Sequence, residues 1–195
     1  MNLYGQTQKE ILEIFRRIRF PGRNATKFNG DVCCRILKHY IEREIGRAFK
    51  IVSPNAYIKG HPVEFDLLIV RSKAQPGKYT NAYEPDDVRC VIEVKSKGLV
   101  GKKQELGDQI KRIKTAFRAA QKICPKGTFV YFTFREAVPK RRGSIQYWKK
   151  TVKGLDPFRA FCMSNSRYKN PPLEGQWEAF VKHLRGCLKK SAGRR

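Results

Sequence analysis

Acidic side chains interrupt two short apolar segments of the sequence, residues 63–70 and residues 88–95. Both segments are rich in β-branched and aliphatic residues, which is typical of buried β-strands. Asp66 lies inside the first segment, and Glu93 and Lys95 share one face of the second, because side chains alternate along a strand. Burying an ionised carboxylate is costly unless an opposite charge or a metal ion compensates it. The pattern therefore predicts a divalent-metal site with a lysine beside it.

The order of these residues resembles the motif of the PD-(D/E)xK nuclease superfamily, which includes restriction endonucleases and Holliday-junction resolvases. Asp66 is followed by Glu93-Val94-Lys95, with one residue between the glutamate and the lysine. The aspartate lies in one expected strand, and the E-x-K triplet lies at the end of another. The proline departs from the pattern, because Pro62 precedes Asp66 by four residues instead of directly.

The resemblance extends over residues 30–134 and implies a restriction endonuclease-like fold that hydrolyses phosphodiester bonds. It implies that Asp66, Glu93 and the backbone carbonyl of Val94 hold Mg²⁺ or Mn²⁺. Such a hard cation takes oxygen ligands and makes water a better nucleophile. Lys95 is then expected to orient or activate the attacking water and to stabilise the charge that develops on the phosphoryl group.

A further acid and an amide are candidates for this site. Residues 31–49 are expected to form a helix, and Glu44 falls near the middle of its apolar face. The resemblance implies an additional acid from a helix before the first strand, more often from its first half. Asp31 is the acid in that half, but it is also a natural N-cap, so the choice stays open. Gln109, on the helix that follows Lys95, is the candidate amide.

Periodicity orders the core elements as αβββαβ, which is the order of the nuclease core. We therefore expect an α/β fold in which a mixed central sheet is flanked by helices, with extra helices at the N- and C-terminal ends. The expected helices cover residues 6–19, 31–49, 103–123 and 174–190, and the expected strands cover residues 51–58, 63–70, 88–95 and 128–134.

The chain has 195 residues and is 41% hydrophobic, which is enough to bury one sizeable core. We expect three regions: a basic N-terminal helix and loop at 1–29, the nuclease-like core at 30–134, and a basic extension at 135–195 that packs on the core. The six cysteines form no C-x-x-C pair and have no zinc-type spacing. Reduced thiols and a cytoplasmic location are therefore expected.

The formal net charge is +25, from 42 Lys and Arg against 17 Asp and Glu. This charge favours nucleic acid as the partner. A membrane partner is not expected, because no apolar stretch approaches the roughly 20 residues that span a bilayer. The connection at 71–87 can touch the substrate if it lies beside the metal site, and a linker is the equal alternative. The candidate nucleic-acid contacts are Lys73, Lys78, Lys97, Lys140, Arg141 and Arg142.

Three functions are compatible with this sequence. A metal-dependent endonuclease acting on nucleic acid, with DNA as the first choice, accounts for all three residues of the motif. A protein of the same fold that binds nucleic acid without cutting it is the second. A basic RNA-associated structural or assembly protein is the third. Many members of the superfamily act as dimers, so a homodimer is compatible with the resemblance. Mg²⁺-dependent cleavage separates the first function from the other two.

Overall fold

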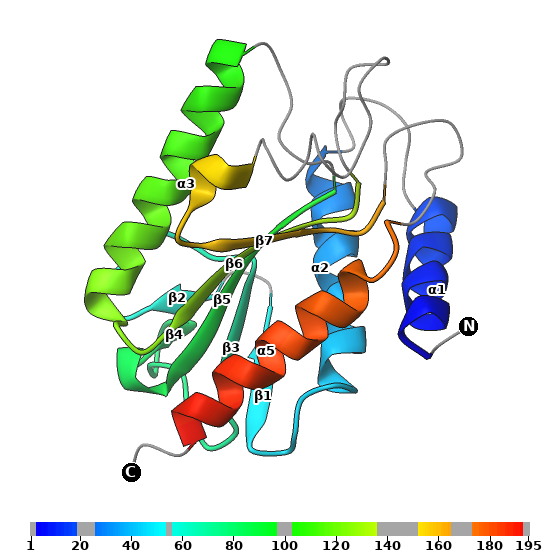
Figure 1. The fold of residues 1–195 in the computed structure, drawn as a ribbon. Helices are drawn as coiled ribbons and strands as arrows, with labels where there is room; N and C mark the ends of the chain where they lie inside the picture. The colour runs from blue at the N-terminus through cyan, green and yellow to red at the C-terminus, as the bar shows by residue number, and fades with distance from the viewer. Residues whose placement is uncertain are drawn as a thin grey trace.

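Five strands form one mixed sheet through the middle of the protein (Figure 1). The computed structural model describes residues 3–18, 26–53, 56–96, 103–135, 152–164 and 173–192, and the structural statements below concern these residues. The order across the sheet is β1 (Phe49–Val52), β3 (Leu67–Arg71), β5 (Val88–Lys95), β6 (Thr128–Thr133) and β7 (Arg159–Cys162). The first three strands pair antiparallel, and β5, β6 and β7 pair parallel.

Helices cover both faces of the sheet, because its central strands are apolar on both sides. Cys90, Ile92 and Val94 of β5 pack into the core under three of the helices, whereas Val91 packs into the core under the fourth. Figure 1 shows the single helix on one side of the sheet and the other three on the opposite side. The three helices are α1 (Leu3–Ile18), α2 (Thr26–Glu42) and α5 (Gln176–Ala192), and the single one is α3 (Lys103–Ile123).

The expected αβββαβ order and the mixed sheet flanked by helices are confirmed. The strand at 88–95 and the helix at 103–123 have the expected bounds. Other elements differ. The strand expected at 51–58 is the shorter β1, Phe49–Val52, and the helix expected at 6–19 is α1, Leu3–Ile18. The helix expected at 31–49 begins at Thr26 and ends at Glu42, so the expectation that Asp31 is its N-cap is wrong. The second core strand begins at Leu67, so Asp66 comes directly before the strand instead of inside it.

The region 135–195 adds a strand and a helix to the core. The fifth strand of the sheet, β7, had no counterpart among the expected elements, whereas α5 lies close to the expected helix at 174–190. Trp177, Phe180 and Leu184 of α5 are buried in the same core as α1 and α2. The small elements are β2 (Tyr57–Ile58) and β4 (Ala82–Tyr83), which pair parallel, and the 3₁₀ turns η1 (Pro85–Asp87) and η2 (Lys153–Leu155). None of the described helices is long and apolar enough to cross a membrane.

A buried glutamine joins α1 to the C-terminal region, and we expect its loss to destabilise the protein. Gln8 Nε2 donates to the carbonyls of Met163 at 2.8 Å and Leu173 at 2.7 Å, and Gln8 Oε1 accepts from the Trp177 N–H at 3.2 Å. Gln8→Ala should lower the free energy of unfolding by about 2–4 kcal/mol, because buried partners lose their hydrogen bonds. Urea unfolding measures this change. The exposed Gln6→Ala on the same helix is the control, and equal effects of both substitutions would contradict the assignment.

Candidate active site

The pairing of β3 with β5 brings the acidic residues of the two expected strands to one end of the sheet. The two strands run antiparallel, and Leu67 at the start of β3 is the register partner of Ile92 near the end of β5. Asp66, which comes directly before Leu67, therefore lies beside Glu93, which follows Ile92. Lys95, two residues after Glu93, lies on the same face of β5 as Glu93.

One ammonium group connects the two carboxylates. Lys95 Nζ lies 3.2 Å from Asp66 Oδ2 and also forms an ion pair with Glu93 Oε1. The backbone N–H of Val94 donates to the same Asp66 oxygen at 2.7 Å. All three side chains are half-buried, with relative exposures of 30% for Asp66, 24% for Glu93 and 42% for Lys95. The site is thus reachable from solvent while its charges are partly shielded from water.

Burial and mutual attraction shift the proton affinities of this cluster. Burial raises the pKa of the Glu93 carboxyl, Lys95 opposes that shift, and the negative charge of Asp66 adds to it. Burial by itself lowers the pKa of Lys95, but the attraction of Glu93 and Asp66 outweighs burial and leaves that pKa raised. Lys95 therefore stays an ammonium and offsets the repulsion between the two carboxylates.

The neighbours of the cluster come from β6 and α2. Tyr131 and Thr133 are the register partners of Glu93 and Lys95 on β6, and both are buried. Burial, followed by the charge of Asp66, raises the pKa of Cys34 to about 12, which places the first half of α2 close to the carboxylates. The sequence did not single out Cys34 as a neighbour of the site, although an apolar helix face containing Cys33 was expected to be buried.

The donor set fits a hard divalent cation. Among the described residues there is no group of three His, Cys, Asp or Glu side chains that could hold a metal ion. Mg²⁺, however, keeps several water ligands and is commonly bound through one or two carboxylates. Asp66 and Glu93 supply two carboxylates that share one counter-charge, Lys95, and a cation can take over part of that compensation.

Of the two additional candidates, Glu44 lies in the turn after α2 and Gln109 lies on α3. Glu44 does not join the carboxylates, because its side chain pairs with Arg185 of α5 at 2.7 Å. It lies two residues beyond the end of α2, and the helical residues from Cys34 to Glu42 already span about 12 Å at 1.5 Å per residue. Gln109 is half-buried in the first half of α3. Since α3 follows β5 and leads back to β6, that half lies toward the carboxylate end of the sheet.

Glu44→Gln separates a structural role of this residue from a catalytic one. We expect the substitution to leave any cleavage rate unchanged within about twofold, because Glu44 pairs with Arg185 and not with the cluster. It should lower the free energy of unfolding by about 0.5–1 kcal/mol, as expected for a partly exposed ion pair. Cleavage rates and urea unfolding, measured on the same preparation, check both statements. A large loss of cleavage in a stably folded variant would instead show that Glu44 takes part in the reaction.

Two of the six candidate nucleic-acid contacts, Lys73 and Lys78, lie within the described residues. The connection that carries Lys73 and Lys78 joins the end of β3 to the start of β5, so it lies at the end of the sheet opposite the carboxylates. The condition under which this connection could touch the substrate at the metal site is therefore not met. Lys78 instead lies over the ring of the exposed Tyr79, at 5.1 Å from the ring centroid. Lys97, Lys140, Arg141 and Arg142 lie outside the described residues.

No protein-family model and no curated protein matches this sequence. Solved structures do match its fold. The cAAA-bound form of NucC from E. coli MS115-1 matches with a TM-score of 0.64 and 12% identity, covering 95% of this chain and 89% of that chain. NucC from P. aeruginosa ATCC27853, also cAAA-bound, matches with a TM-score of 0.62 and 10% identity, covering 96% and 92%. The apo form of the E. coli protein gives a TM-score of 0.61 and 12% identity, covering 97% and 91%.

These identities are low, so the likeness concerns the fold. The chain has the restriction endonuclease-like fold of NucC, with a central mixed sheet flanked by helices. The match covers nearly the whole length of both chains, and it therefore includes the terminal helices outside the region of the sequence motif.

Proposed function

We propose that this protein is a metal-dependent endonuclease that hydrolyses phosphodiester bonds of DNA. The observation that carries the proposal is the convergence of Asp66, Glu93 and Lys95 at one end of the sheet, in a restriction endonuclease-like fold. Solved structures of NucC share this fold over nearly the whole chain. The net charge of +25 supports a polyanionic substrate.

Asp66, Glu93 and the backbone carbonyl of Val94 are the groups that would hold Mg²⁺ or Mn²⁺. When bound, such an ion supplies charge stabilisation for the phosphoryl oxygens and lowers the pKa of water. The Val94 N–H, which donates to Asp66 Oδ2, fixes the orientation of that carboxylate before any ligand arrives. Preorganisation of this kind lowers the reorganisation needed during the reaction.

Lys95 is proposed to position the attacking water and to stabilise the negative charge that develops during phosphoryl transfer. Its pKa is raised by Glu93 and Asp66 beyond the opposing effect of burial, so it acts as a cation and hydrogen-bond donor at neutral pH. It is therefore assigned to electrostatic stabilisation and orientation of water rather than to proton abstraction.

A panel of substrates tests the activity and the substrate class together. Wild-type protein is incubated with supercoiled plasmid, a four-way junction, single-stranded DNA and structured RNA, with Mg²⁺, with Mn²⁺ and with EDTA. Cleavage of a DNA substrate that requires metal supports the proposal. If only RNA is cleaved, the substrate is RNA and not DNA. Salt-sensitive binding without cleavage under any condition would instead indicate a binding protein of the same fold.

A homodimer is proposed as the active form, because two copies would place one site on each strand of a duplex. Sedimentation analysis of the protein, with and without a short DNA duplex, measures its oligomeric state. A monomer in both conditions that still cuts both strands would contradict this part of the proposal.

A further inference from the structure

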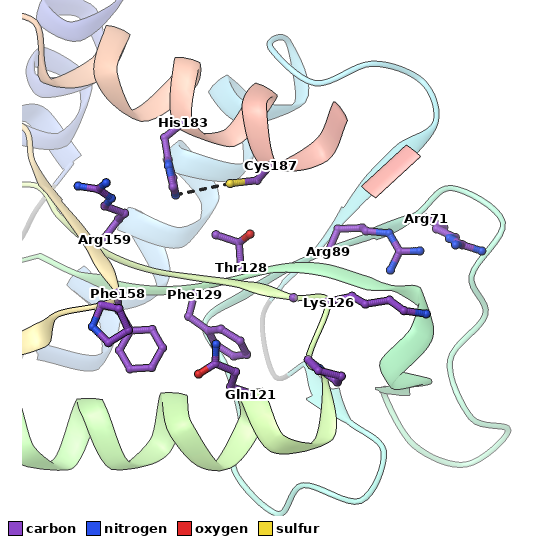
Figure 2. Close-up of a pocket in the computed structure, with 13 residues that line it drawn as sticks. Arg71, Arg89, Gln121, Lys126, Thr128, Phe129, Phe158, Arg159, His183 and Cys187 are labelled. Carbon is purple, nitrogen blue, oxygen red and sulfur yellow. Dashed lines mark hydrogen bonds between the residues drawn. The ribbon is translucent and has the colours of Figure 1, made fainter. Parts of the chain in front are cut away.

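A basic pocket lies at the end of the sheet opposite the carboxylates. Its volume is about 640 Å³, and it opens between the start of β6, the loop before β7, and the last turns of α3 and α5 (Figure 2). Arg89 in its wall precedes Glu93 by four residues on β5, which places the pocket about 13 Å from that carboxylate along the strand. The pocket is thus separate from the candidate active site.

Cations surround this pocket without matching anions. Arg71, Arg89, Lys126 and Arg159 line it, and no Asp or Glu is among its described lining residues. Lys126 pairs with Asp86 at 3.2 Å, outside the lining. The three arginines form no ion pair with any described residue. In Figure 2, Arg159 lies on one side of the pocket and Arg89, Lys126 and Arg71 lie on the other.

Arg89 is the most constrained of these cations. It is only 3% exposed, and its Nη1 donates to the carbonyls of Asp86 at 2.7 Å and Val88 at 3.0 Å. Burial, and then the like charge of Arg71, lower the pKa of its guanidinium, while Asp87, Cys124 and Asp86 act in the opposite direction. A guanidinium remains charged even so. A buried charge of this kind is normally paired, and the pocket beside it has room for an anion.

Arg89 lies on β5 at an irregularity in the pairing of β5 with β3. Ile69 of β3 pairs with Cys90 of β5, but the next residue of β3, Val70, pairs with Val88. Arg89 is therefore the additional residue of a β-bulge. Bulges redirect one side chain and are common beside functional sites. The bulge explains why Arg89 reaches the pocket at the end of the sheet instead of following the simple alternation of β5.

The remaining walls suit a flat ring beside the anionic group. Phe129, Phe158 and Pro157 contribute apolar surface, and Gln121 contributes an amide that can donate and accept hydrogen bonds. Thr128 and Phe129 precede the part of β6 that pairs with β7, which begins at Val130. A volume of about 640 Å³ lies within the range of small-ligand pockets, which is typically 300–1,000 Å³.

We propose that this pocket binds a phosphate-bearing ligand of nucleotide size. Arg89 and Arg71, on one side of the pocket, bind the phosphate, since the planar guanidinium matches the oxygens of a phosphate group in a bidentate fashion, and Arg159 meets the ligand from the opposite side. The apolar wall and Gln121 hold the ring. The site is independent of the metal-dependent chemistry at the other end of the sheet.

Binding of AMP, adenosine and inorganic phosphate, measured by calorimetry in EDTA, tests the proposal. EDTA and the Asp66→Asn variant remove any contribution of the candidate active site, so a protein without nuclease activity would still give a result. We expect AMP to bind wild type and Asp66→Asn with the same affinity. Inorganic phosphate should compete with AMP, and adenosine should bind at least tenfold more weakly, because it lacks the charged group.

The mutational test uses the exposed Arg71 and Arg159, because substitution of the buried Arg89 can impair folding. Arg71→Gln and Arg159→Gln should each weaken AMP binding by about tenfold or more, as expected for a lost charge-assisted hydrogen bond. Arg112→Gln, an exposed arginine of α3 outside the pocket, should leave binding unchanged. Absence of AMP binding, or binding that survives the Arg71→Gln/Arg159→Gln pair, would overturn the proposal. The proposal would also be overturned if this pair of substitutions weakened the binding of duplex DNA but not the binding of AMP. The pocket would then be part of a nucleic-acid surface.

Discussion

Lys95→Met is expected to lower the single-turnover cleavage rate by at least roughly 10²–10³-fold while metal binding persists. Methionine keeps the length of the side chain and removes its charge. The ammonium lies 3.2 Å from Asp66 Oδ2 and pairs with Glu93, so it is placed to meet both a water molecule and the reacting phosphate at the carboxylates. Its loss leaves the two carboxylates without their shared cation, and they should then bind Mn²⁺ at least as tightly as in the wild type.

A second lysine provides a matched control for this prediction. Lys59 pairs with Glu84 at 2.7 Å, next to the small β2–β4 ladder, and it is also an ion-paired lysine. Lys59→Met should keep wild-type cleavage. Calorimetry with Mn²⁺ measures metal binding, and circular dichroism confirms the fold of both variants. If Lys95→Met cuts as fast as wild type, the lysine has no part in the chemistry.

The elements that hold the site were predictable because each is long and strongly patterned. β5 is an eight-residue strand and α3 is a helix of 21 residues, and both agree with the sequence reading at each end. The proximity of Asp66 to Glu93 also follows from the sequence once the two strands are taken as neighbours. In an antiparallel pair, the start of one strand meets the end of the other.

The same reasoning also decides where the connection at 71–87 lies. The connection at 71–87 leaves the end of β3 and enters the start of β5, so antiparallel pairing sends it away from Asp66. The early start of α2 was harder to foresee. Its first turns contain Asn29 and Gly30, which have poor helix propensity, and burial of Val32 and Cys33 in the core favours the helix despite them.

Other features depend on contacts between residues that are distant in the sequence, and a local sequence pattern does not predict such contacts. β7 has only four residues and follows a long basic segment, so its strand character becomes evident only when it pairs with β6. The arginines of the basic pocket come from β3, β5 and β7, and they line one pocket because of the bulge at Arg89 and the stagger between β6 and β7. Three separate arginines in a chain with 42 basic residues give no signal in the sequence.

Asp66→Asn should abolish cleavage by a different route from Lys95→Met, because it should remove metal binding as well. Asparagine has the same shape, and its side-chain oxygen can still accept the Val94 N–H that now reaches Asp66 Oδ2 at 2.7 Å. The fold should therefore persist. The substitution removes one of two carboxylates, so Mn²⁺ affinity should fall by about tenfold or more and the cleavage rate by at least roughly 10²–10³-fold.

Asp86→Asn is the matched control for this loss of charge. Asp86 lies 3.2 Å from Lys126, the same separation as that between Asp66 and Lys95, but at the opposite end of β5. Its substitution should change neither Mn²⁺ affinity nor cleavage. The two site variants then divide the roles: Lys95→Met retains metal and loses chemistry, whereas Asp66→Asn loses both. If Asp66→Asn kept full Mn²⁺ affinity, the metal would have to be held elsewhere, and the carboxylate pair would need another explanation.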